Sequence, residues 1–264
     1  MFDPAKRNAD TTTIITGGTQ GLGFAVAEQL MVEGATRFAL AARSEDKGEA
    51  AAGELRKRGA DAIFIPADMA VVEDCTAMVE KAVAHFGTVN GLVNAAANTE
   101  RGTLLNTSVE FYDKVMAINT RGPFFTMQAF VRHCLDAGHP GRIVNILSTE
   151  RHCGQPFLCS YAASKAALGV FTKNVAHSHR HDRINCNAVA PGWMDTPQEH
   201  LVQTTTEGKP ENWLEMAEKN EPFGQLIKPP EIAGLISYLL SPQIGVMTGA
   251  ILDHDQQVMG APEG

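Results

Sequence analysis

Thr16–Gly23, with the sequence TGGTQGLG, joins a predicted strand to a predicted helix. The apolar run TTIIT before it is typical of a buried strand, and FAVAEQLMVEG after it repeats apolar residues at helical spacing. Glycines let the backbone turn sharply and approach a ligand, while the start of the helix offers free N–H groups and a positive dipole end. The stretch therefore predicts a turn that holds the pyrophosphate of a dinucleotide, although such turns also occur without a ligand.

Beyond this turn, short apolar runs alternate with amphipathic stretches of helical length. Strands are predicted within RFALAA, AIFIP, VNGLVNAA, RIVNIL, RINCNAVAPG and GAILDHD, and helices at 45–58, 73–86, 108–137 and 160–177 and within EIAGLISYLL. Near-continuous apolar strands that alternate with helices indicate a parallel sheet covered on both faces. We therefore expect one α/β domain over residues 1–264, a Rossmann-type doubly wound parallel sheet of about seven strands.

Residues 198–223 interrupt this alternation. The segment, QEHLVQTTTEGKPENWLEMAEKNEPF, is polar and carries no clear strand or helix pattern. Long polar insertions in a compact domain often close over a site. We expect an irregular segment that acts as a substrate lid.

Charge and composition exclude several classes of function. The 264 residues carry a net charge of −8, which opposes non-specific binding to nucleic acid or to acidic membranes. No apolar run approaches the roughly 18 residues of a membrane span, and the polar N-terminus lacks the apolar core of a signal peptide. We expect a cytoplasmic protein with a small-molecule substrate and neither nucleic-acid nor membrane partners.

Neither the cysteines nor the histidines predict a metal site. The five cysteines are odd in number and form no C-x-x-C pair, so we expect reduced structural thiols at Cys75, Cys134, Cys153, Cys159 and Cys186. The histidines at 177, 179 and 181 are spaced by two at the end of a predicted helix. Residues two apart do not share a helix face, so we expect no metal ion there.

The residues after the second predicted strand bear on which dinucleotide binds. An acidic residue there accepts from the ribose 2′-OH of NAD, whereas an arginine suits the 2′-phosphate of NADP. This chain has Arg43 and Ser44, and no carboxylate ends the strand. The pattern favours NADP(H). NAD(H) stays open, because Arg43 can also be explained as a solvated charge that opens the next helix.

A tyrosine and a lysine share one face of the helix predicted at 160–177. Tyr161 and Lys165 are four residues apart, which is one helical turn. A phenol has a pKa of about 10, and an ammonium about 4 Å away lowers it by roughly three units at an effective dielectric of about 20. The pair predicts a phenol that exchanges a proton with a substrate oxygen. Ser148 follows the strand RIVNIL and is expected to face the same crevice.

These motifs together resemble the short-chain dehydrogenase/reductase family. They are TGxxxGxG at 16–23, Asp68, Asn94, Asn119, Ser148, YxxxK at 161–165 and Pro191-Gly192. Each is common alone, but their order and spacing are specific, and the resemblance runs from Thr12 to about Gly260. It implies an NAD(P)-dependent oxidoreductase acting on a carbonyl/alcohol pair. It also implies a homotetramer or dimer, with the helices at 108–137 and 160–177 as candidate interfaces.

The resemblance also implies roles for individual residues. Tyr161 would be the general acid/base, and Lys165 would lower its pKa and hold the nicotinamide ribose. Ser148 would bind the substrate oxygen, and Asn119 would hold a water that relays protons. Asp68 would meet the adenine ring. The implied cofactor contacts are Thr16, Gly17, Thr19, Gln20, Gly21, Leu22, Gly23, Arg43, Ser44, Asp68, Met69, Asn94, Ala95, Ala96, Tyr161, Lys165, Pro191, Gly192, Met194 and, at the nicotinamide carboxamide, Thr196.

The sequence departs from the family pattern twice. Where the family usually has NNAG, this chain has NAAA at 94–97, which adds a methyl group where backbone and cofactor run close. It also loses an asparagine that could brace the sheet. Gln20 stands where NADP-preferring members often carry a basic residue, which weakens the preference for NADP without reversing it.

The expected pocket wall is polar. The segment after Ser148 is TERHCGQ, and the candidate substrate contacts are Asn98, Glu150, His152, Gln155 and Trp193. Such groups suit a sugar, a polyol or a cyclic keto-alcohol better than a steroid or an acyl chain. Equally, these side chains could face solvent. Two other functions stay open, an NAD(H)-dependent polyol or sugar dehydrogenase and a non-catalytic dinucleotide-sensing protein.

Overall fold

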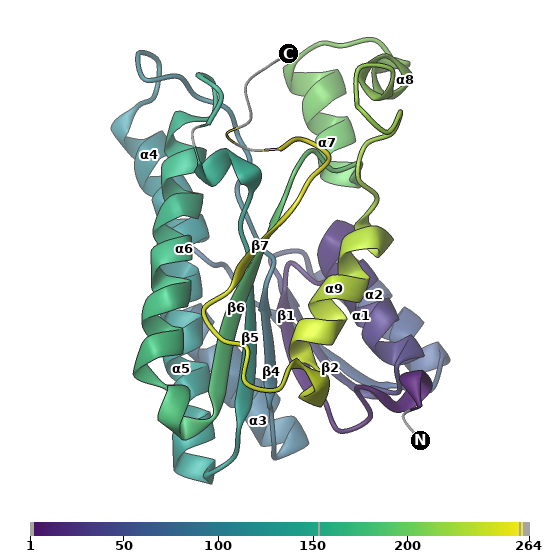
Figure 1. The fold of residues 1–264 in the computed structure, drawn as a ribbon, viewed down its shortest axis with the longest axis vertical. Helices are drawn as coiled ribbons and strands as arrows, with labels where there is room; N and C mark the ends of the chain where they lie inside the picture. Colours follow the sequence, from purple (N-terminus) through teal and green to yellow (C-terminus); the bar gives the residue numbers. More distant parts are fainter. Residues whose placement is uncertain (1–2, 153, 259, 261–264) are drawn as a thin grey trace.

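The computed structural model describes residues 3–152, 154–258 and 260, and its centre is one parallel sheet (Figure 1). The strand order is β3-β2-β1-β4-β5-β6-β7, so the chain starts in the middle, winds to one edge and then crosses over to build the other half. This doubly wound, seven-stranded sheet confirms the predicted fold class. The strands are β1 Thr12–Thr16, β2 Arg37–Ala42, β3 Asp61–Pro66, β4 Gly91–Asn94, β5 Gly141–Ile146, β6 Ile184–Pro191 and β7 Ile251–His254.

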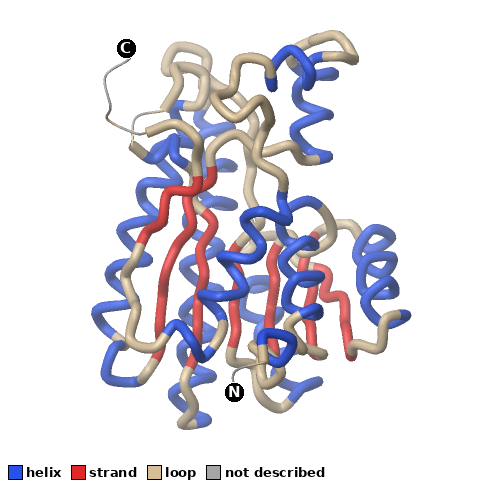
Figure 2. Tube along the Cα trace, turned by 45° about the vertical axis from the view of Figure 1, so that its right-hand side comes forward, coloured by secondary structure: helices blue, strands red, loops and turns tan. Residues whose placement is uncertain are grey.

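Helices cover both faces of the sheet, as Figure 2 shows with the strands in a single layer. One face carries α1 Gly21–Val32, α2 Glu45–Lys57 and α9 Pro229–Leu240; the other carries α3 Val72–Phe86, α4 Val109–Met116, α5 Gly122–Ala137 and α6 Cys159–Ser178. Side chains alternate along each strand, so Ile14 and Ile15 of β1 are fully buried in two different cores. The near-continuous apolar strands follow from this two-sided burial.

The helix predicted at 108–137 is interrupted. A π-helical turn at Ala117–Arg121 separates α4 from α5. A π turn inserts an extra residue and shifts the backbone hydrogen bonds, and such turns are frequent at functional sites. Periodicity alone did not reveal it, since the apolar spacing continues across the insertion. Asn119 lies within this turn.

The segment predicted as irregular at 198–223 contains short helices. They are α7 Pro197–Leu201, a π-helical turn at Val202–Thr206 and α8 Trp213–Glu218, and they stand above the upper end of the strands in Figure 1. Trp213 is only 2% exposed because its ring contacts those of His200 and Trp193. The segment therefore has a small core of its own, which its polar composition concealed. The remaining short turns are Pro4–Lys6, Thr149–Arg151, Arg180–Asp182 and Pro242–Ile244.

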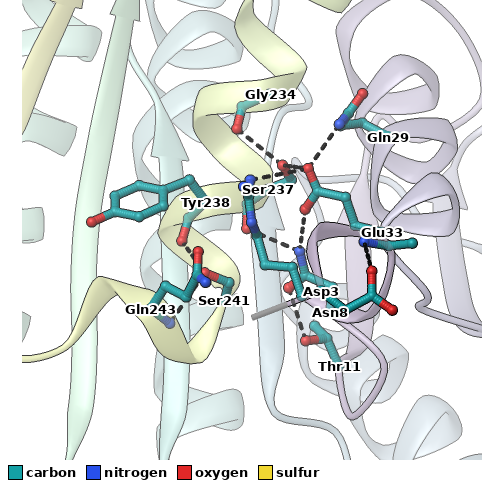
Figure 3. A network of polar contacts seen from close by, with 12 residues as sticks. Asp3, Asn8, Thr11, Gln29, Glu33, Gly234, Ser237, Tyr238, Ser241 and Gln243 are labelled. Carbon is teal, nitrogen blue, oxygen red and sulfur yellow. Dashed lines mark hydrogen bonds and ion pairs between the residues drawn. The ribbon is translucent and has the colours of Figure 1, made fainter. Parts of the chain in front are cut away.

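A buried carboxylate ties the N-terminal segment to the rest of the fold (Figure 3). Glu33, at the end of α1, accepts hydrogen bonds from Asn8 Nδ2 at 2.7 Å, Gln29 Nε2 at 2.8 Å and Ser237 Oγ at 3.0 Å. Arg7 pairs with the same carboxylate at 3.2 Å. These contacts, the Glu33 clasp, join α1, α9 and the chain's start at the end of the sheet where the strands begin.

None of the helices in the described part of the chain has the length and hydropathy of a membrane crossing. Four cysteines are free thiols, with Cys75, Cys134 and Cys186 buried and Cys159 exposed, while Cys153 lies outside the described residues. Across residues 3–152, 154–258 and 260, no three His, Cys, Asp or Glu side chains come together as a metal site.

Candidate active site

The carboxyl ends of the parallel strands bring the predicted site residues to one edge of the sheet. The glycine turn follows β1, Arg43 follows β2, and Asp68 follows β3. Ala95 and Ser148 follow β4 and β5 respectively. The stretch with Gly192, Met194 and Thr196 follows β6. This edge is where open α/β sheets bind their ligands.

The glycine turn is built for close approach. Gly17 has φ +66°, and a Cβ there would lie 2.9 Å from the backbone of Ala96. A Cβ at Gly23 would lie 2.4 Å from the carbonyl oxygen of Gly17, so only glycine lets α1 start so near the turn. Gln20, the N-cap residue of α1, makes no capping bond with its side chain. Free N–H groups at this helix start fit the pyrophosphate of a dinucleotide.

The NAAA departure is accommodated by the turn after β4. Thr16 Oγ1 accepts from the backbone N–H groups of Ala95 at 3.1 Å and Ala96 at 3.2 Å, while Ala97 is exposed. Asn94 Nδ2 donates to Asn145 Oδ1 at 2.8 Å, which bridges β4 and β5. The retained asparagine therefore braces the sheet.

The side chains expected at the adenosine end follow β2 and β3, on one side of the glycine turn in the strand order. Arg43 and Ser44 are exposed just beyond β2. Asp68 Oδ1 accepts from the N–H of Ala70 at 2.9 Å, which holds the loop after β3, and Met69 is 6% exposed. The exposed Arg43 lies beyond the strand next to β1, and the half-buried Asp68 lies beyond the following strand, β3.

The two residues expected to carry the chemistry lie in the first two turns of α6. Tyr161 is partly buried, and Lys165 is 2% exposed. Lys165 Nζ donates to the carbonyl oxygen of Ile146 at 2.7 Å and lies 5.7 Å from the centroid of the Tyr161 ring. Ser148 is 8% exposed and its Oγ accepts from the N–H of Glu150 at 3.2 Å.

The structure corrects the expected effect of Lys165 on Tyr161. Burial raises the pKa of Tyr161 to about 12, a hydrogen bond with Ser148 lowers it, and the charges of Glu150 and Glu199 raise it. Burial lowers the pKa of Lys165 to about 8. Burial outweighs the effect that lowers the phenol's pKa, so the net shift is upward, opposite to the expected lowering. At neutral pH the phenol keeps its proton and is placed to donate it.

Asn119 uses its whole side-chain amide as a brace. Its Oδ1 accepts from Asn98 N at 2.7 Å, and its Nδ2 donates to Asn98 O at 2.9 Å and to Ser164 Oγ at 3.0 Å. Ser164 Oγ in turn donates to the carbonyl oxygen of Tyr161 at 2.6 Å. The π turn thus fixes the loop after β4 against the helix that carries Tyr161. Sequence reasoning placed Asn119 at the site without this bracing contact.

The candidate substrate contacts divide into two groups. Glu150 lies near enough to raise the pKa of Tyr161, and Asn98 is buried beside Asn119. His152 instead pairs with Asp253 of β7 at 3.0 Å, and Gln155 is exposed with its N–H donated to Glu150 at 2.7 Å. The structure gives His152 a partner on β7 that its place in the loop did not suggest.

Trp193 contacts a residue that the sequence analysis missed. Its indole Nε1 donates to Glu199 Oε1 at 3.0 Å, and Arg101 donates to the same oxygen at 3.2 Å. Arg101 and Glu199 are 98 positions apart in the sequence. No motif or spacing links them, so only the folded chain could reveal the contact.

Comparison with known proteins agrees with this geometry. The short chain dehydrogenase family model matches residues 11–207. An uncharacterised oxidoreductase of Thermotoga maritima is 35% identical over 243 residues, covering 92% of this chain and 94% of that protein. The 3beta-hydroxysteroid dehydrogenase 1 of Eggerthella lenta is 30% identical over 255 residues, covering 97% and 95%. A crystal structure of an actinorhodin polyketide ketoreductase variant with NADPH superimposes with a TM-score of 0.86 at 30% identity, covering 93% and 96%.

The glycine turn and the Tyr161–Lys165 pair agree with these matches. This chain belongs to the short-chain dehydrogenase/reductase family. It is a dehydrogenase/reductase that depends on a nicotinamide dinucleotide. The family and the reaction class that the sequence predicts are confirmed.

Proposed function

We propose that this protein interconverts a carbonyl and a secondary alcohol with NADP(H), on a compact polar substrate such as a sugar, a polyol or a cyclic keto-alcohol. The observation that carries the proposal is the position of Tyr161, next to the buried Lys165 in the first turns of α6, at the edge of the sheet where Ser148 follows β5 and the glycine turn follows β1. A proton donor beside a dinucleotide cradle is the arrangement that carbonyl reduction requires.

In the proposed reaction, Tyr161 and Ser148 act together on the substrate oxygen. Ser148 donates a hydrogen bond that holds this oxygen, and Tyr161 gives up its proton as negative charge develops there. The bound dinucleotide supplies the hydride, while the protein supplies position and electrostatics. Lys165, with its lowered pKa, would hold the nicotinamide ribose and replace the proton of Tyr161, and Asn119 would keep the proton path to solvent open.

The cofactor would lie along the strand ends from Arg43 to Thr196. Thr196 Oγ1 accepts from the N–H of Glu199 at 3.2 Å, which leaves its own O–H to donate to the carboxamide oxygen. The exposed Arg43 favours the 2′-phosphate of NADP. Because Gln20 adds no positive charge beside it, the second candidate is an NAD(H)-dependent polyol or sugar dehydrogenase on the same site.

The surroundings of Tyr161 favour a polar substrate. Glu150 and Glu199 both act on the phenol, and Asn98 is held by Asn119, which is also bonded to Ser164 of the helix that carries Tyr161. We further propose that the 198–223 segment is a lid over this pocket, within one domain that spans residues 1–264. Its helix α7 contacts the loops that follow β4 and β6 through Arg101 and Trp193, and Trp213 of α8 contacts the Trp193 ring.

A second copy of the chain is proposed to cover the face formed by α4, α5 and α6. This face has a hollow of about 730 Å³, lined among others by Phe124, Phe125 and Phe171. The aromatic lining supports a homodimer or homotetramer through these helices. Light scattering of the purified protein measures its molar mass and so checks the proposal.

Nicotinamide absorbance tests the function directly. NADP(H) and NAD(H) are run in parallel, in both directions, against sugars, polyols, cyclic ketones and acyl ketones. We expect turnover with NADPH on a hydroxylated or cyclic ketone. Turnover on acyl ketones alone would contradict the proposed substrate class. Binding of NADPH with no turnover on any substrate would contradict the proposed reaction.

A further inference from the structure

Glu199 connects the proposed nicotinamide end of the site to the segment at 198–223. It lies in the first turn of α7, where its backbone N–H donates to the N-cap residue Thr196 at 3.2 Å. Its side chain is only 14% exposed, although it belongs to a polar stretch of sequence. A buried carboxylate is costly unless hydrogen bonds and a counter-charge compensate it.

Three donors from different parts of the chain meet at one oxygen of this carboxylate. Glu199 Oε1 accepts from Gln203 Nε2 at 2.6 Å, Trp193 Nε1 at 3.0 Å and Arg101 NH2 at 3.2 Å. Gln203 is on the same helical segment, Trp193 follows β6, and Arg101 belongs to the loop between β4 and α4. Glu199 is therefore the point at which two walls of the pocket meet.

Arg101 makes this junction rigid. Its side chain is 16% exposed, and its Nε lies 3.0 Å from Glu207 Oε1. Its guanidinium also lies 5.5 Å from the ring centroid of Phe157, in the loop before α6. A planar guanidinium with two carboxylates and an aromatic ring is held in a single orientation. Arg101, which follows β4, is thus joined to Phe157 after β5 by the ring contact and to Glu199 and Glu207 after β6 by ion pairs.

We propose that Glu199 is a positioning residue that orients the Trp193 indole and makes the pocket selective for substrates without a negative charge beside the reacting carbonyl. The inference rests on the proposed function. The orientation follows from the Trp193 hydrogen bond, since an indole has one N–H and here it is directed to Glu199. The selectivity follows from position and charge. The backbone N–H of Glu150 donates to Ser148 Oγ at 3.2 Å and that of Glu199 to Thr196 Oγ1 at 3.2 Å, so both carboxylates belong to residues held against the proposed site and would repel an anionic group bound there.

The test compares Glu199→Gln with a matched control, Glu207→Gln. Both variants remove one carboxylate that faces Arg101, but only Glu199 also holds Trp193. We expect Glu199→Gln to raise KM for a neutral ketone about tenfold with little change in kcat, which corresponds to one lost charge-assisted hydrogen bond. Its discrimination against the carboxylated analogue of that ketone should fall. Glu207→Gln should change neither value more than about twofold.

A pH profile separates positioning from a purely structural role. The negative charge of Glu199 raises the pKa of Tyr161, so removing it lets the phenol lose its proton at lower pH. The alkaline limb of kcat/KM for ketone reduction should therefore move to lower pH in Glu199→Gln and stay in place in Glu207→Gln. Identical profiles and identical substrate discrimination in the two variants would overturn the proposal.

Tryptophan fluorescence needs no turnover and so distinguishes the two proposals. Glu199→Leu, which removes the acceptor of the indole N–H, is expected to increase quenching by iodide because the Trp193 indole is freed, whereas Glu207→Leu should resemble the native protein. If this difference appears in a protein without ketone turnover, the proposed function fails but the positioning of Trp193 stands. If turnover is present and the fluorescence of the two variants is the same, the positioning role is overturned.

Discussion

Two buried carboxylates occupy opposite ends of the sheet and use the same chemistry. Glu33, at the end where the strands begin, accepts from Asn8, Gln29 and Ser237 and pairs with Arg7. Glu199, at the end where the strands finish, accepts from Gln203, Trp193 and Arg101, so one of its partners is likewise an arginine. Their side chains are 8% and 14% exposed, so burial alone does not tell them apart.

What differs is the kind of element that supplies the donors. Around Glu33, the donors come from α1, α9 and the segment that enters β1, so the clasp holds parts of the fold together (Figure 3). Around Glu199, two of the donors come from loops at the ligand-binding edge. Loops there carry function, whereas contacts between helices and the chain's start carry stability. The same buried carboxylate thus stabilises the fold at one end and shapes the site at the other.

Removing the phenol should have the largest effect and leave the clasp untouched. In Tyr161→Phe, the substrate oxygen loses its proton donor, so kcat should fall by about 10³-fold. The dissociation constant for NADPH and the melting temperature should hardly change. Stopped-flow turnover and fluorescence titration with NADPH measure the two quantities. A kcat within about tenfold of the native value would contradict the role of Tyr161.

Breaking the clasp should separate stability from activity. Glu33→Ala removes the acceptor shared by Asn8 and Ser237 and the ion-pair partner of Arg7, and we expect a loss of about 2–4 kcal/mol in the free energy of unfolding. Urea denaturation measures this loss, and kcat and KM should stay near native values at 25 °C. Glu199→Ala is the matched comparison and should cost less, about 1–2 kcal/mol, because Arg101 keeps Glu207 as a partner while Trp193 and Gln203 lose their acceptor. An equal loss of unfolding free energy in Glu33→Ala and Glu199→Ala would contradict the idea that Glu33 mainly stabilises the fold and Glu199 mainly shapes the site.

The buried ammonium of Lys165 should lower the free energy of unfolding near neutral pH. Its pKa is about 8 in the folded protein and about 10.5 in the unfolded chain, so between these values the unfolded chain holds the proton that the native state has released. The free energy of unfolding should therefore rise with pH, by about 2 kcal/mol between pH 7.5 and 9.5. Above pH 10, the raised pKa of Tyr161 acts in the opposite direction.

Lys165→Met is the control for this pH dependence. The variant should be more stable than the native protein near pH 7, and the difference should shrink as pH rises towards 9.5. Denaturation curves at each pH measure it. If the native protein and Lys165→Met show the same change in the free energy of unfolding between pH 7.5 and 9.5, the buried ammonium does not lower stability.

Arg43→Ala should give the smallest of these effects. Loss of a phosphate contact at the surface should weaken NADPH binding by about tenfold and leave NADH binding unchanged. Titration with the two cofactors checks the difference, and Arg58→Ala, which removes an arginine paired with Glu28, controls for net charge. Equal loss with NADPH and NADH, or no loss, would favour the NAD(H)-dependent alternative.

The sequence predicted those parts of the site that belong to local patterns. The glycine turn, the Tyr161–Lys165 spacing and the position of Ser148 after a strand are all short-range features, and their shared edge follows from a parallel sheet. The apolar alternation likewise predicted seven strands and the helices between them, although it missed the π turn at 117–121, which leaves the apolar spacing intact.

Only the tertiary structure decided how the charged side chains are paired. Lys165 donates to the Ile146 carbonyl, His152 pairs with Asp253, and Arg101 reaches Glu199 across 98 positions of sequence. Periodicity and spacing determined which residues arrive at the strand ends. The partner that each charge finds there depends on distances of a few ångströms between segments far apart in the chain, and on which donors burial leaves without water. Such contacts are a property of the packed molecule and have no local signature in its sequence.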